Sequence, residues 1–434
     1  MKSLKKVYSM LLKQGAGPPC IPMVSTGDIV KRGHLIARPD GLGANLHASV
    51  GGTVIKVTDQ SIFIEASEWQ NDDFEPVMAA KDSSIADMVK AAGVVGMGGA
   101  GFPTWIKLNT QLKDGTVIAN AVECEPLLKH NIRQLMKNPQ MVYQGMLYAM
   151  KSVHAKKGIL AIKNKNREAA RAFSAQVQSG DSIKIAFLPD QYPMGEERAI
   201  IRETLGVLLK PDQLPSDAEA VVLNVETLSR IAEAVKFKRP AISKNVTITG
   251  KLGSGMKEQV LFDVPLGTPV RELIEQCGGI EGNYGEIIMG GPFMGKSVEL
   301  DDAITKTSGG MMITMEFMRE SRAMGLLVCA CGAGEARLRE IAGHMGAPVA
   351  GVEHCKQAIE GRGSLKCEDP GNCPGQAEKI MSLRNKGAQV LLVSNCSDCT
   401  NTVMCVAPKL KLPVYHCTDH VMRTVNHPLI RRLK

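Results

Sequence analysis

The stretch Val94–Leu108, VVGMGGAGFPTWIKL, decides the fold predicted for the middle of this chain. Gly96, Gly98 and Gly101 fit the pattern G-x-G-x-x-G, whose glycines let backbone N–H groups approach a phosphate. In dinucleotide-binding sheets the pattern follows a strand and opens a helix. Here the preceding residues, SIADMVKAAG, have a helical pattern. The sequence therefore argues against that usual fold, although the loop and Lys107 could still hold a phosphate. A tight turn without a ligand is the alternative.

Strands and helices alternate from about residue 87 to residue 240, which predicts α/β architecture. Apolar runs at 116–123, 158–163 and 182–189 indicate strands. Residues 131–155, NIRQLMKNPQMVYQGMLYAMKSVHA, have the periodicity of one long amphipathic helix. The segment MGEERAIIRETLG indicates another helix, with glutamates in its first turn and a terminal glycine.

Three more motifs place polar residues at predicted strand ends. They are NAVECEP at 120–126, YPMGEE at 192–197 and VVLNVETL at 221–228. Beside a glycine loop, such groups can bind ribityl hydroxyls, the edge of an isoalloxazine or a nicotinamide ribose. Because carboxylates repel phosphate, the glutamates should lie away from it, at hydroxyl or amide donors.

The order GGAGFPT, NA-x-E-x-EP, Y-x-x-GEE and NVET resembles the flavin subunit of complex I. It is closer still to the C subunit of Rnf electron-transport complexes. The resemblance implies FMN and NADH, with nicotinamide C4 close to flavin N5 so that the flavin does the chemistry. The implied cofactor-binding residues are Gly96, Gly98, Gly99, Phe102, Lys107, Asn120, Glu123, Glu125, Tyr192, Gly195, Glu196, Glu197, Asn224 and Thr227.

The resemblance also assigns roles to these residues. The FMN phosphate would lie near Gly98, Gly99 and Asn224 or Thr227. Four side chains would line the flavin, and a further group would receive the nicotinamide nucleotide. The flavin-lining residues are Lys107, Asn120, Glu123 and Tyr192, and the nucleotide-binding residues are Phe102, Glu125 and the pair Glu196–Glu197. Trp105 replaces a glycine of the complex I type, which puts the shape of the nucleotide entrance in question.

The whole chain is predicted to be a multidomain α/β protein. Residues 1–66 resemble the barrel-sandwich hybrid of lipoyl carriers, although HASVGG occupies the tip where the carrier lysine would lie. Residues 67–242 form the domain that resembles the complex I flavin subunit. Residues 243–316 have the pattern of a β-grasp (SLBB) module. Residues 317–434 form a small, cysteine-rich α/β domain.

Composition narrows the function. The net charge of +8 suits an anionic cofactor or an acidic partner, and aromatic residues make up only 4%, without the stacking motifs of nucleic-acid binding. No run of 18 apolar residues exists and the first residues lack a secretion-signal core, so we expect a cytoplasmic protein that is not inserted in a membrane.

Nine of the twelve cysteines follow residue 328, which indicates metal or dithiol chemistry in the last domain. Cys396 and Cys399 form C-x-x-C where a strand meets a helix, and the helix dipole would stabilise a thiolate there. Cys329 and Cys331 also end a predicted strand. If the two strands are parallel neighbours, both pairs emerge at one carboxyl edge. These four cysteines are the predicted catalytic residues. Zinc or cluster ligation is the alternative for the C-x-x-C pair.

The remaining tail cysteines leave two possibilities open. Cys367 and Cys373 lie in the loop GRGSLKCEDPGNCPG, near Cys355, and could form a local disulfide or hold a metal. No Cys/His spacing matches a zinc finger, and no defined metal site is predicted from the sequence. The ferredoxin-type run C-x2-C-x2-C-x3-C-P of Rnf C subunits is missing from the sequence.

The tail, with NCSDCTNTVM and HCTDHVMRTVNHPL, is similar to that of proline-reductase-associated electron-transfer proteins. This resemblance implies an NADH-oxidising flavoprotein that passes electrons through FMN to a cysteine dithiol and on to a partner reductase, D-proline reductase. A corrinoid (cobalamin) reductase-like flavoprotein is one alternative. A non-catalytic docking subunit of an electron-transfer complex is the other.

Overall fold

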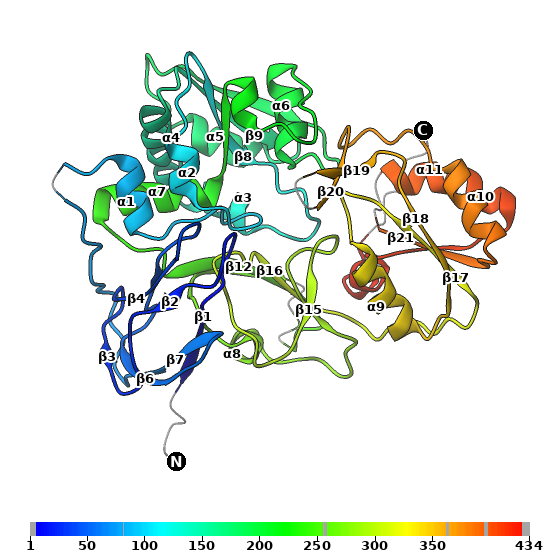
Figure 1. Ribbon diagram of the computed structural model, residues 1–434, viewed down its shortest axis with the longest axis horizontal. Coiled ribbons are helices and arrows are strands. Elements are labelled where there is room, and N and C mark those ends of the chain that lie inside the picture. Colours follow the sequence, from blue (N-terminus) through cyan, green and yellow to red (C-terminus); the bar gives the residue numbers. More distant parts are fainter. Residues whose placement is uncertain are drawn as a thin grey trace.

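The computed structural model describes residues 6–80, 82–253, 255, 258–361, 364–394 and 398–427. Two parallel sheets with helices on both faces lie side by side, and smaller β units lie beneath them (Figure 1). We call the units built on these two sheets the first α/β domain and the C-terminal α/β domain.

The first α/β domain has a parallel sheet in the order β10-β9-β8-β11. Its strands are β8 (Thr116–Ala121), β9 (Lys157–Lys163), β10 (Ile183–Leu188) and β11 (Ala220–Asn224). Its helices are α1 (Ile85–Ala91), α2 (Thr104–Leu108), α3 (His130–Lys137), α4 (Pro139–Val153), α5 (Arg167–Ser174), α6 (Glu197–Leu205) and α7 (Val225–Phe237), with the 3₁₀ turn η1 (Pro215–Ala218). Alternate residues of β8 face opposite cores: Val117 and Ala119 pack with α4 and α7, and Ile118 packs with α6.

The single long helix expected at 131–155 is wrong, because the structure divides it into α3 and α4 at Asn138. Pro139 has no N–H and its ring would clash with the preceding turn of a continuous helix. It therefore lies at the first position of α4, where that N–H is not needed. The Asn138 side chain accepts a hydrogen bond from the Met141 N–H at 3.4 Å and caps the new helix.

The N-terminal β unit has two antiparallel sheets, ordered β1-β7-β6-β3 and β2-β4-β5. Their strands are β1 (Val7–Leu11), β2 (Ile21–Pro22), β3 (Ile29–Val30), β4 (Leu35–Arg38), β5 (Leu46–His47), β6 (Gly52–Val57) and β7 (Ser61–Ala66). This unit supports the glycine loop: Ala16 N–H donates to the Gly101 carbonyl at 3.1 Å, and Trp105 Nε1–H donates to the Gly43 carbonyl at 3.3 Å.

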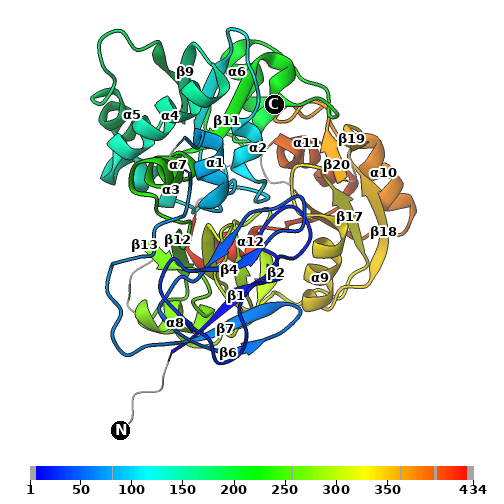
Figure 2. The same ribbon diagram turned by 60° about the vertical axis from the view of Figure 1, so that its left-hand side comes forward.

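A mixed sheet, β13-β12-β16-β14-β15, with one helix follows the first α/β domain. Its elements are β12 (Ser243–Gly250), β13 (Glu258–Pro265), α8 (Val270–Gln276), β14 (Ile287–Met289), β15 (Lys296–Val298) and β16 (Gly310–Ile313). In Figure 2 it lies behind the N-terminal unit, and Ser49 Oγ bonds the Leu266 carbonyl at 2.5 Å between the two. The assignment of this sheet to the SLBB family stays a prediction.

The C-terminal α/β domain has a second parallel sheet, ordered β18-β17-β21-β22. Its elements are β17 (Met324–Val328), α9 (Glu335–Met345), β18 (Val349–His354), the hairpin β19 (Ala358–Gly361) and β20 (Ser364–Cys367), α10 (Ala377–Asn385), β21 (Val390–Val393), α11 (Asp398–Val406), η2 (Ala407–Leu410), β22 (Val414–His416) and α12 (Asp419–Thr424). Helix α9 packs on one face, and α10 and η2 pack on the other. The hairpin reaches toward the first α/β domain (Figure 1).

Candidate functional site

The glycine loop contacts the start of helix α7. Met97 N–H donates to Thr227 Oγ1 at 3.0 Å, and a Cβ on Gly98 would lie 2.5 Å from Asn224 Nδ2. Asn224 caps α7, because its Oδ1 accepts from the Glu226 N–H at 2.8 Å. The loop apex at Gly98 and Gly99 is exposed, and a Cβ on Gly99 would meet nothing within 4 Å. The predicted loop and the predicted NVET motif therefore lie together at one helix N-terminus.

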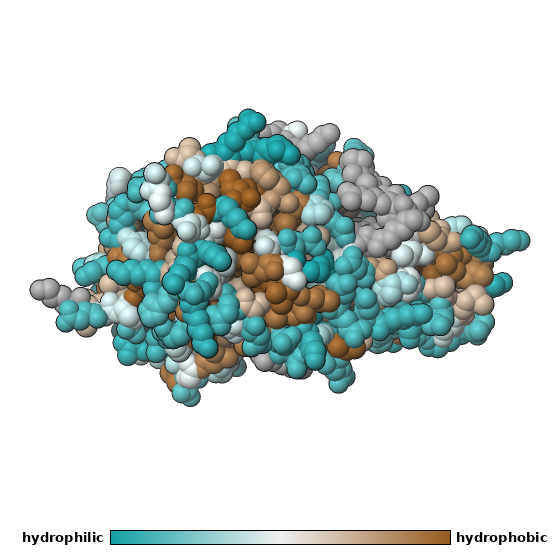
Figure 3. All heavy atoms as spheres, turned by 90° about the horizontal axis from the view of Figure 1, so that it is seen from above, coloured by the Kyte–Doolittle hydropathy of each residue, from teal (hydrophilic) through white to brown (hydrophobic). Residues whose placement is uncertain are grey.

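Helix α1, which precedes the loop, explains why the usual dinucleotide fold does not form here. The chain enters the glycine loop from α1 instead of from a strand, as its sequence pattern predicted. The loop is closed by the Gly96 N–H bond to the Phe102 carbonyl at 2.9 Å. Phe102 is 37% exposed. Other apolar patches lie between polar residues on the face seen in Figure 3, so exposure alone does not mark Phe102 as a binding residue.

Lys107 and Glu197 lie in contact beside this loop. Lys107 Nζ donates to Glu197 Oε1 and, at 3.1 Å, to the Val222 carbonyl. Asn120, at the end of β8, donates to the Gly195 carbonyl at 3.1 Å. The ends of β8 and β11 and the start of α6 are thus joined, which brings together residues that the sequence predicted from three separate motifs.

The boundary between the first α/β domain and its neighbouring units carries three of the predicted residues, Glu123, Glu125 and Tyr192. Glu125 accepts from the Phe293 and Met294 N–H groups of the mixed sheet unit, each at 2.9 Å. Burial raises the pKa of Glu125 to about 7, and burial also raises the pKa of Glu123. The Tyr192 ring stacks on Phe293 at 3.9 Å between ring centroids.

Glu196 has a structural role in this conformation. It caps α6, because its carboxylate accepts from the Arg198 N–H at 2.8 Å and the Ala199 N–H at 3.0 Å. It also pairs with Arg198 Nε at 3.0 Å. The carboxylates predicted to receive a nucleotide are thus engaged within the protein: Glu196 with α6, Glu197 with Lys107, and Glu125 with the neighbouring unit.

Five cysteines of the C-terminal α/β domain line one small cavity with Tyr192 and Pro193. They are Cys329, Cys331, Cys355, Cys367 and Cys373. The Sγ atoms of Cys329 and Cys331 lie 3.2 Å apart, and no disulfide joins any two cysteines in the part of the chain that the structure describes. The Cys331 thiol donates to Cys367, which lowers the pKa of Cys367; hydrogen bonds to Cys329 and Cys367 raise the pKa of Cys331 well above its ordinary value.

The expected meeting of two strand ends at one edge is confirmed for the strands. β17 and β21 are parallel neighbours, and Cys329 N–H, just after β17, donates to Ser394 Oγ, just after β21, at 2.5 Å. Cys396 lies outside the described residues, and only the backbone of Cys399 is described, in the first turn of α11. The same helix reaches the cavity, since Thr402 Oγ1 lies 3.2 Å from Cys373 Sγ.

Helix α6 and the loop before it hold the cysteine-bearing loop in place. Arg198 Nη2 donates to the Cys367 carbonyl at 2.7 Å, and Gln191 Nε2 donates to the Gly371 carbonyl at 2.6 Å. Arg202 pairs with Asp369 and donates to the Pro370 carbonyl at 2.8 Å. The YPMGEE segment therefore lies directly between the glycine-loop site and the cysteines.

The residues around the glycine loop suit a phosphate-bearing flavin. The loop apex leaves open space at Gly99, and the helix N-terminus beside Gly98 favours an anion. Glu123 and Glu125 bond to Asn131 and to the mixed sheet unit, whereas Glu197 lies beside the loop with Lys107. The expectation that the glutamates lie away from the phosphate stays a prediction.

The comparisons with known proteins agree with this geometry. Residues 89–233 match the family described as the Nuo51 FMN-binding domain, and residues 1–71 match the RnfC barrel sandwich hybrid domain. The C subunit of the Na(+)-translocating ferredoxin:NAD(+) oxidoreductase complex of Acetobacterium woodii is 32% identical over 319 residues, 69% of this chain and 71% of that protein. The chain belongs to the family of Rnf complex C subunits. Its central domain is thus an FMN-binding domain of a redox family.

Two further relatives show where the similarity lies. The C subunit of the proton-translocating ferredoxin:NAD(+) oxidoreductase complex of Clostridium ljungdahlii is 34% identical over 69% of each chain. Cobalamin reductase PduS of Salmonella typhimurium is 35% identical over 54% of this chain and 51% of that protein.

In the described parts of the chain, no helix is both long and apolar enough to cross a membrane.

Some residues at this junction were not predicted. Phe293, Arg198 and Gln191 have no special sequence context, and only the fold places them against Glu125 and the cysteine loop. Cys367 was predicted only as a member of a local disulfide or metal group. The distribution of cysteines along the tail was the signal available, and it could not show which of them meet.

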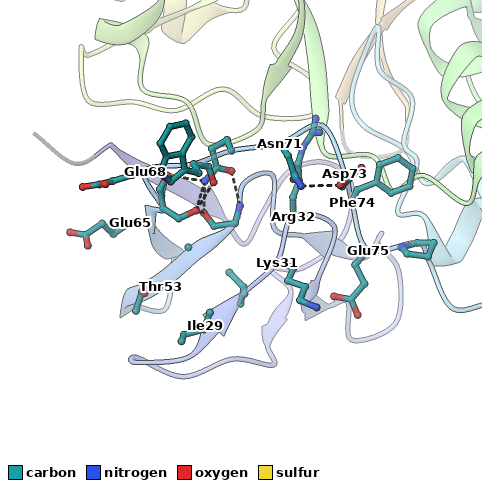
Figure 4. A pocket seen from close by; sticks show the side chains of 18 residues that line it. Ile29, Lys31, Arg32, Thr53, Glu65, Glu68, Asn71, Asp73, Phe74 and Glu75 are labelled. Carbon is teal, nitrogen blue, oxygen red and sulfur yellow. Dashed lines mark hydrogen bonds between the residues drawn. The ribbon is translucent and has the colours of Figure 1, made fainter. Parts of the chain in front are cut away.

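A separate hollow of about 860 Å³ lies on the N-terminal β unit, beneath the segment 67–76 (Figure 4). Charged side chains of both signs line it, including Lys31, Arg32 and Asp73. Asn71 Nδ2 donates to Asp73 there at 2.9 Å. None of the predicted site residues lines this hollow, so it takes no part in the site described above.

Proposed function

We propose that this chain is an NADH-oxidising flavoprotein that passes electrons from FMN to cysteines of its C-terminal α/β domain and on to a partner reductase. The observation that carries this is the shared cavity between Tyr192 of the FMN-binding domain and the thiols of Cys329 and Cys331. A relay from flavin to sulfur needs these two domains in contact, and Arg198, Gln191 and Arg202 hold them so.

The residues for FMN are those around the glycine loop. Backbone N–H groups at Gly98 and Gly99, with Asn224 and Thr227, would hold the phosphate, and Lys107, Asn120, Glu123 and Tyr192 would line the ring. When bound, FMN would accept hydride from a nicotinamide and release electrons to a neighbouring acceptor. Lys107 is available to a ligand only if its bond to Glu197 opens, and these two partly exposed side chains can move at small cost.

The disulfide that the reduced flavin would break is Cys396–Cys399 as the first choice and Cys329–Cys331 as the second. For a disulfide, the overall reaction balances as NADH, one proton and the disulfide giving NAD⁺ and two thiols. Glu125 and Glu197 would then release their present partners to receive the nucleotide. The proposed acceptor protein is D-proline reductase, and the resemblance of the tail supports this choice.

Anaerobic mixing with NADH tests the proposal. The flavin absorbance near about 450 nm should bleach, and titration should find two new thiols for each NADH consumed beyond the flavin. The variant Cys396→Ser should abolish the new thiols without changing flavin bleaching. Cys405→Ser, in α11, is the matched control and should behave as the wild type. Flavin that bleaches without new thiols in the wild type would refute the thiol relay.

The similarity to cobalamin reductase PduS favours a second candidate, reduction of a corrinoid by the same flavin domain. The assay is the same NADH-reduced protein mixed with cob(II)alamin or with D-proline reductase. Reduction of the corrinoid alone would select the second candidate. A protein that binds no FMN would support a docking subunit instead.

A further inference from the structure

The five cysteines that line the cavity come from four separate places in the C-terminal α/β domain. Cys329 and Cys331 lie in the turn after β17, Cys355 lies just after β18, Cys367 ends β20, and Cys373 precedes α10. Their convergence is not a consequence of sequence proximity. It requires the folded sheet, the β19–β20 hairpin and the loop held by the first α/β domain.

Three of these thiols interact directly, and a buried amide lies against the other two. Cys329 and Cys331 have sulfurs 3.2 Å apart, and Cys331 is hydrogen-bonded to Cys367. Gln376, which is 1% exposed, directs its Nε2 at Cys355 Sγ at 3.1 Å and at Cys373 Sγ at 3.7 Å. A buried amide that donates to two sulfurs is a typical outer partner of thiolate ligands, because it stabilises negative charge on them.

A structural disulfide explains this arrangement poorly. A disulfide needs two sulfurs about 2.05 Å apart, whereas five sulfurs share this space. Several thiolates in one buried cavity repel one another unless a cation lies between them. Among the described residues that line it, none is a lysine, arginine or histidine.

A thiophilic metal would neutralise several such thiolates at once. Tetrahedral metal–sulfur bonds of about 2.3 Å place sulfurs about 3.8 Å apart, so the Cys329–Cys331 pair needs to open by roughly half an ångström. We propose that Cys329, Cys331, Cys355, Cys367 and Cys373 provide the ligands of a thiolate-bound metal centre at the boundary with the FMN-binding domain. This goes beyond the proposed function, since it assigns Cys329 and Cys331 to a metal and leaves the dithiol role to Cys396–Cys399.

A different group is the one whose possible ligand atoms, among the described residues, all lie within 4.8 Å of one another. Glu286, Glu340 and His344 lie close enough to hold an ion. However, Arg337 already donates to both carboxylates, to Glu286 at 3.0 Å and to Glu340 at 2.9 Å. A cationic side chain thus already occupies that group, whereas no cationic side chain is among the described residues that line the cysteine cavity.

The test is metal and acid-labile sulfide analysis of the full chain purified without oxygen. The wild type should hold at least about one equivalent of iron or zinc per chain after dialysis. Cys331→Ser and Cys367→Ser should each weaken metal retention at least about tenfold, the loss typical of removing even an outer partner of a metal site. Cys405→Ser, in the same domain but outside the cavity, should retain the wild-type amount.

The measured iron, zinc and sulfide contents identify which kind of metal centre is bound. Iron with sulfide indicates an iron–sulfur cluster, and iron or zinc without sulfide indicates a single tetrahedral ion; both support the proposal. Metal-free protein, or equal retention by Cys331→Ser, Cys367→Ser and the control, overturns it. FMN binding and flavin bleaching by NADH are measured on the same samples and show that each variant is folded. Bleaching without metal rejects this inference alone, whereas metal without bleaching rejects the proposed function alone.

Discussion

The two parallel sheets of this molecule share an architecture and differ in the residues that come after their strands. In the first α/β domain, β8 and β11 end in or beside Asn120 and Asn224, which lie near a glycine loop and a helix N-terminus. In the C-terminal α/β domain, Cys329 and Ser394 come directly after β17 and β21, and thiols gather at that edge. Ligands of such sheets bind beyond the carboxyl ends of the strands. One scaffold therefore presents amides suited to an anion and the other presents sulfurs suited to electrons or a metal.

We call the strand ends at Cys329 and Ser394 the sulfur edge, and those at Asn120 and Asn224 the amide edge. The first prediction concerns the stability of the contact between the C-terminal α/β domain, which carries the sulfur edge, and the mixed sheet unit. Glu286 precedes β14, accepts from His420 Nε2 of α12 at 2.6 Å and pairs with Arg337 of α9. Hydrogen bonds from His420 and Arg337 outweigh burial and lower the pKa of Glu286 to about 2. Glu286→Gln should reduce the free energy of unfolding at pH 7 by about 3 kcal/mol, the cost of breaking a buried pair.

The pH dependence of the free energy of unfolding tests the same ion pair. Because the folded pKa of Glu286 lies below its ordinary value of 4.5, its contribution is full above pH 4.5 and is lost as the pH falls toward 2. Between pH 5 and pH 3 the wild type should lose about 2 kcal/mol that Glu286→Gln does not lose, measured by urea unfolding. Glu316→Gln, an exposed carboxylate whose backbone lies beside Gly285, is the control and should change stability by less than about 0.5 kcal/mol. Parallel curves for wild type and Glu286→Gln would contradict the prediction.

The second prediction tests the amide edge. A Cβ on Gly98 would lie 2.5 Å from Asn224 Nδ2 and 2.8 Å from its Cγ. Gly98→Ala should therefore displace the residue that caps α7, at a cost of about 2 kcal/mol, and weaken FMN affinity about thirtyfold in a fluorescence titration. Gly343→Ala, where a Cβ in helix α9 meets nothing within 4 Å, should leave the affinity unchanged. Unchanged FMN affinity in Gly98→Ala would show that the phosphate lies elsewhere.

These two edges were predictable to different depths. The amide edge is encoded in short motifs with fixed turn and cap chemistry, so the glycine loop, Asn120 and Asn224 could be placed together before the fold was seen. The sulfur edge depends on β17 and β21 being parallel neighbours, which the sequence could state only as a condition. Once that condition holds, the position of Cys329 beside Ser394 is determined.

Contacts between domains could not be predicted from local patterns. Phe293 stacks on Tyr192, and Glu125 accepts from Phe293 and Met294, 168 and 169 residues away in the sequence. Nothing in the periodicity of either segment reports that proximity. The division at Asn138–Pro139 is different, because proline commonly begins a helix and its presence at 139 outweighs the continuous amphipathic periodicity on either side.

The third prediction tests the link between the two edges. Arg198 is 4% exposed, and its Nη2 donates to the Cys367 carbonyl at 2.7 Å. Arg198→Met removes this donor and leaves a buried carbonyl without it, which costs about 1–2 kcal/mol. Transfer from NADH-reduced flavin to the cysteines should slow about tenfold in stopped flow, whereas flavin bleaching should keep its rate. Arg339→Met, on the exposed face of α9, should alter neither rate. Equal slowing of both steps would mean that Arg198 acts on the FMN-binding domain itself.

The fourth and smallest effect concerns Lys107 and Glu197, which lie in contact although the sequence assigned them to different ligands. Their side chains are 25% and 41% exposed, so solvent screens the pair and its coupling energy should not exceed about 1 kcal/mol. A double-mutant cycle of Lys107→Met and Glu197→Gln, by urea unfolding without FMN, measures that coupling. If the pair opens to receive ligands, saturating FMN should reduce the coupling toward zero, since Lys107 then has a competing partner. Coupling above about 2 kcal/mol that FMN leaves unchanged would mean that the pair permanently links α2 to α6. The FMN phosphate would then have to bind a cation other than Lys107.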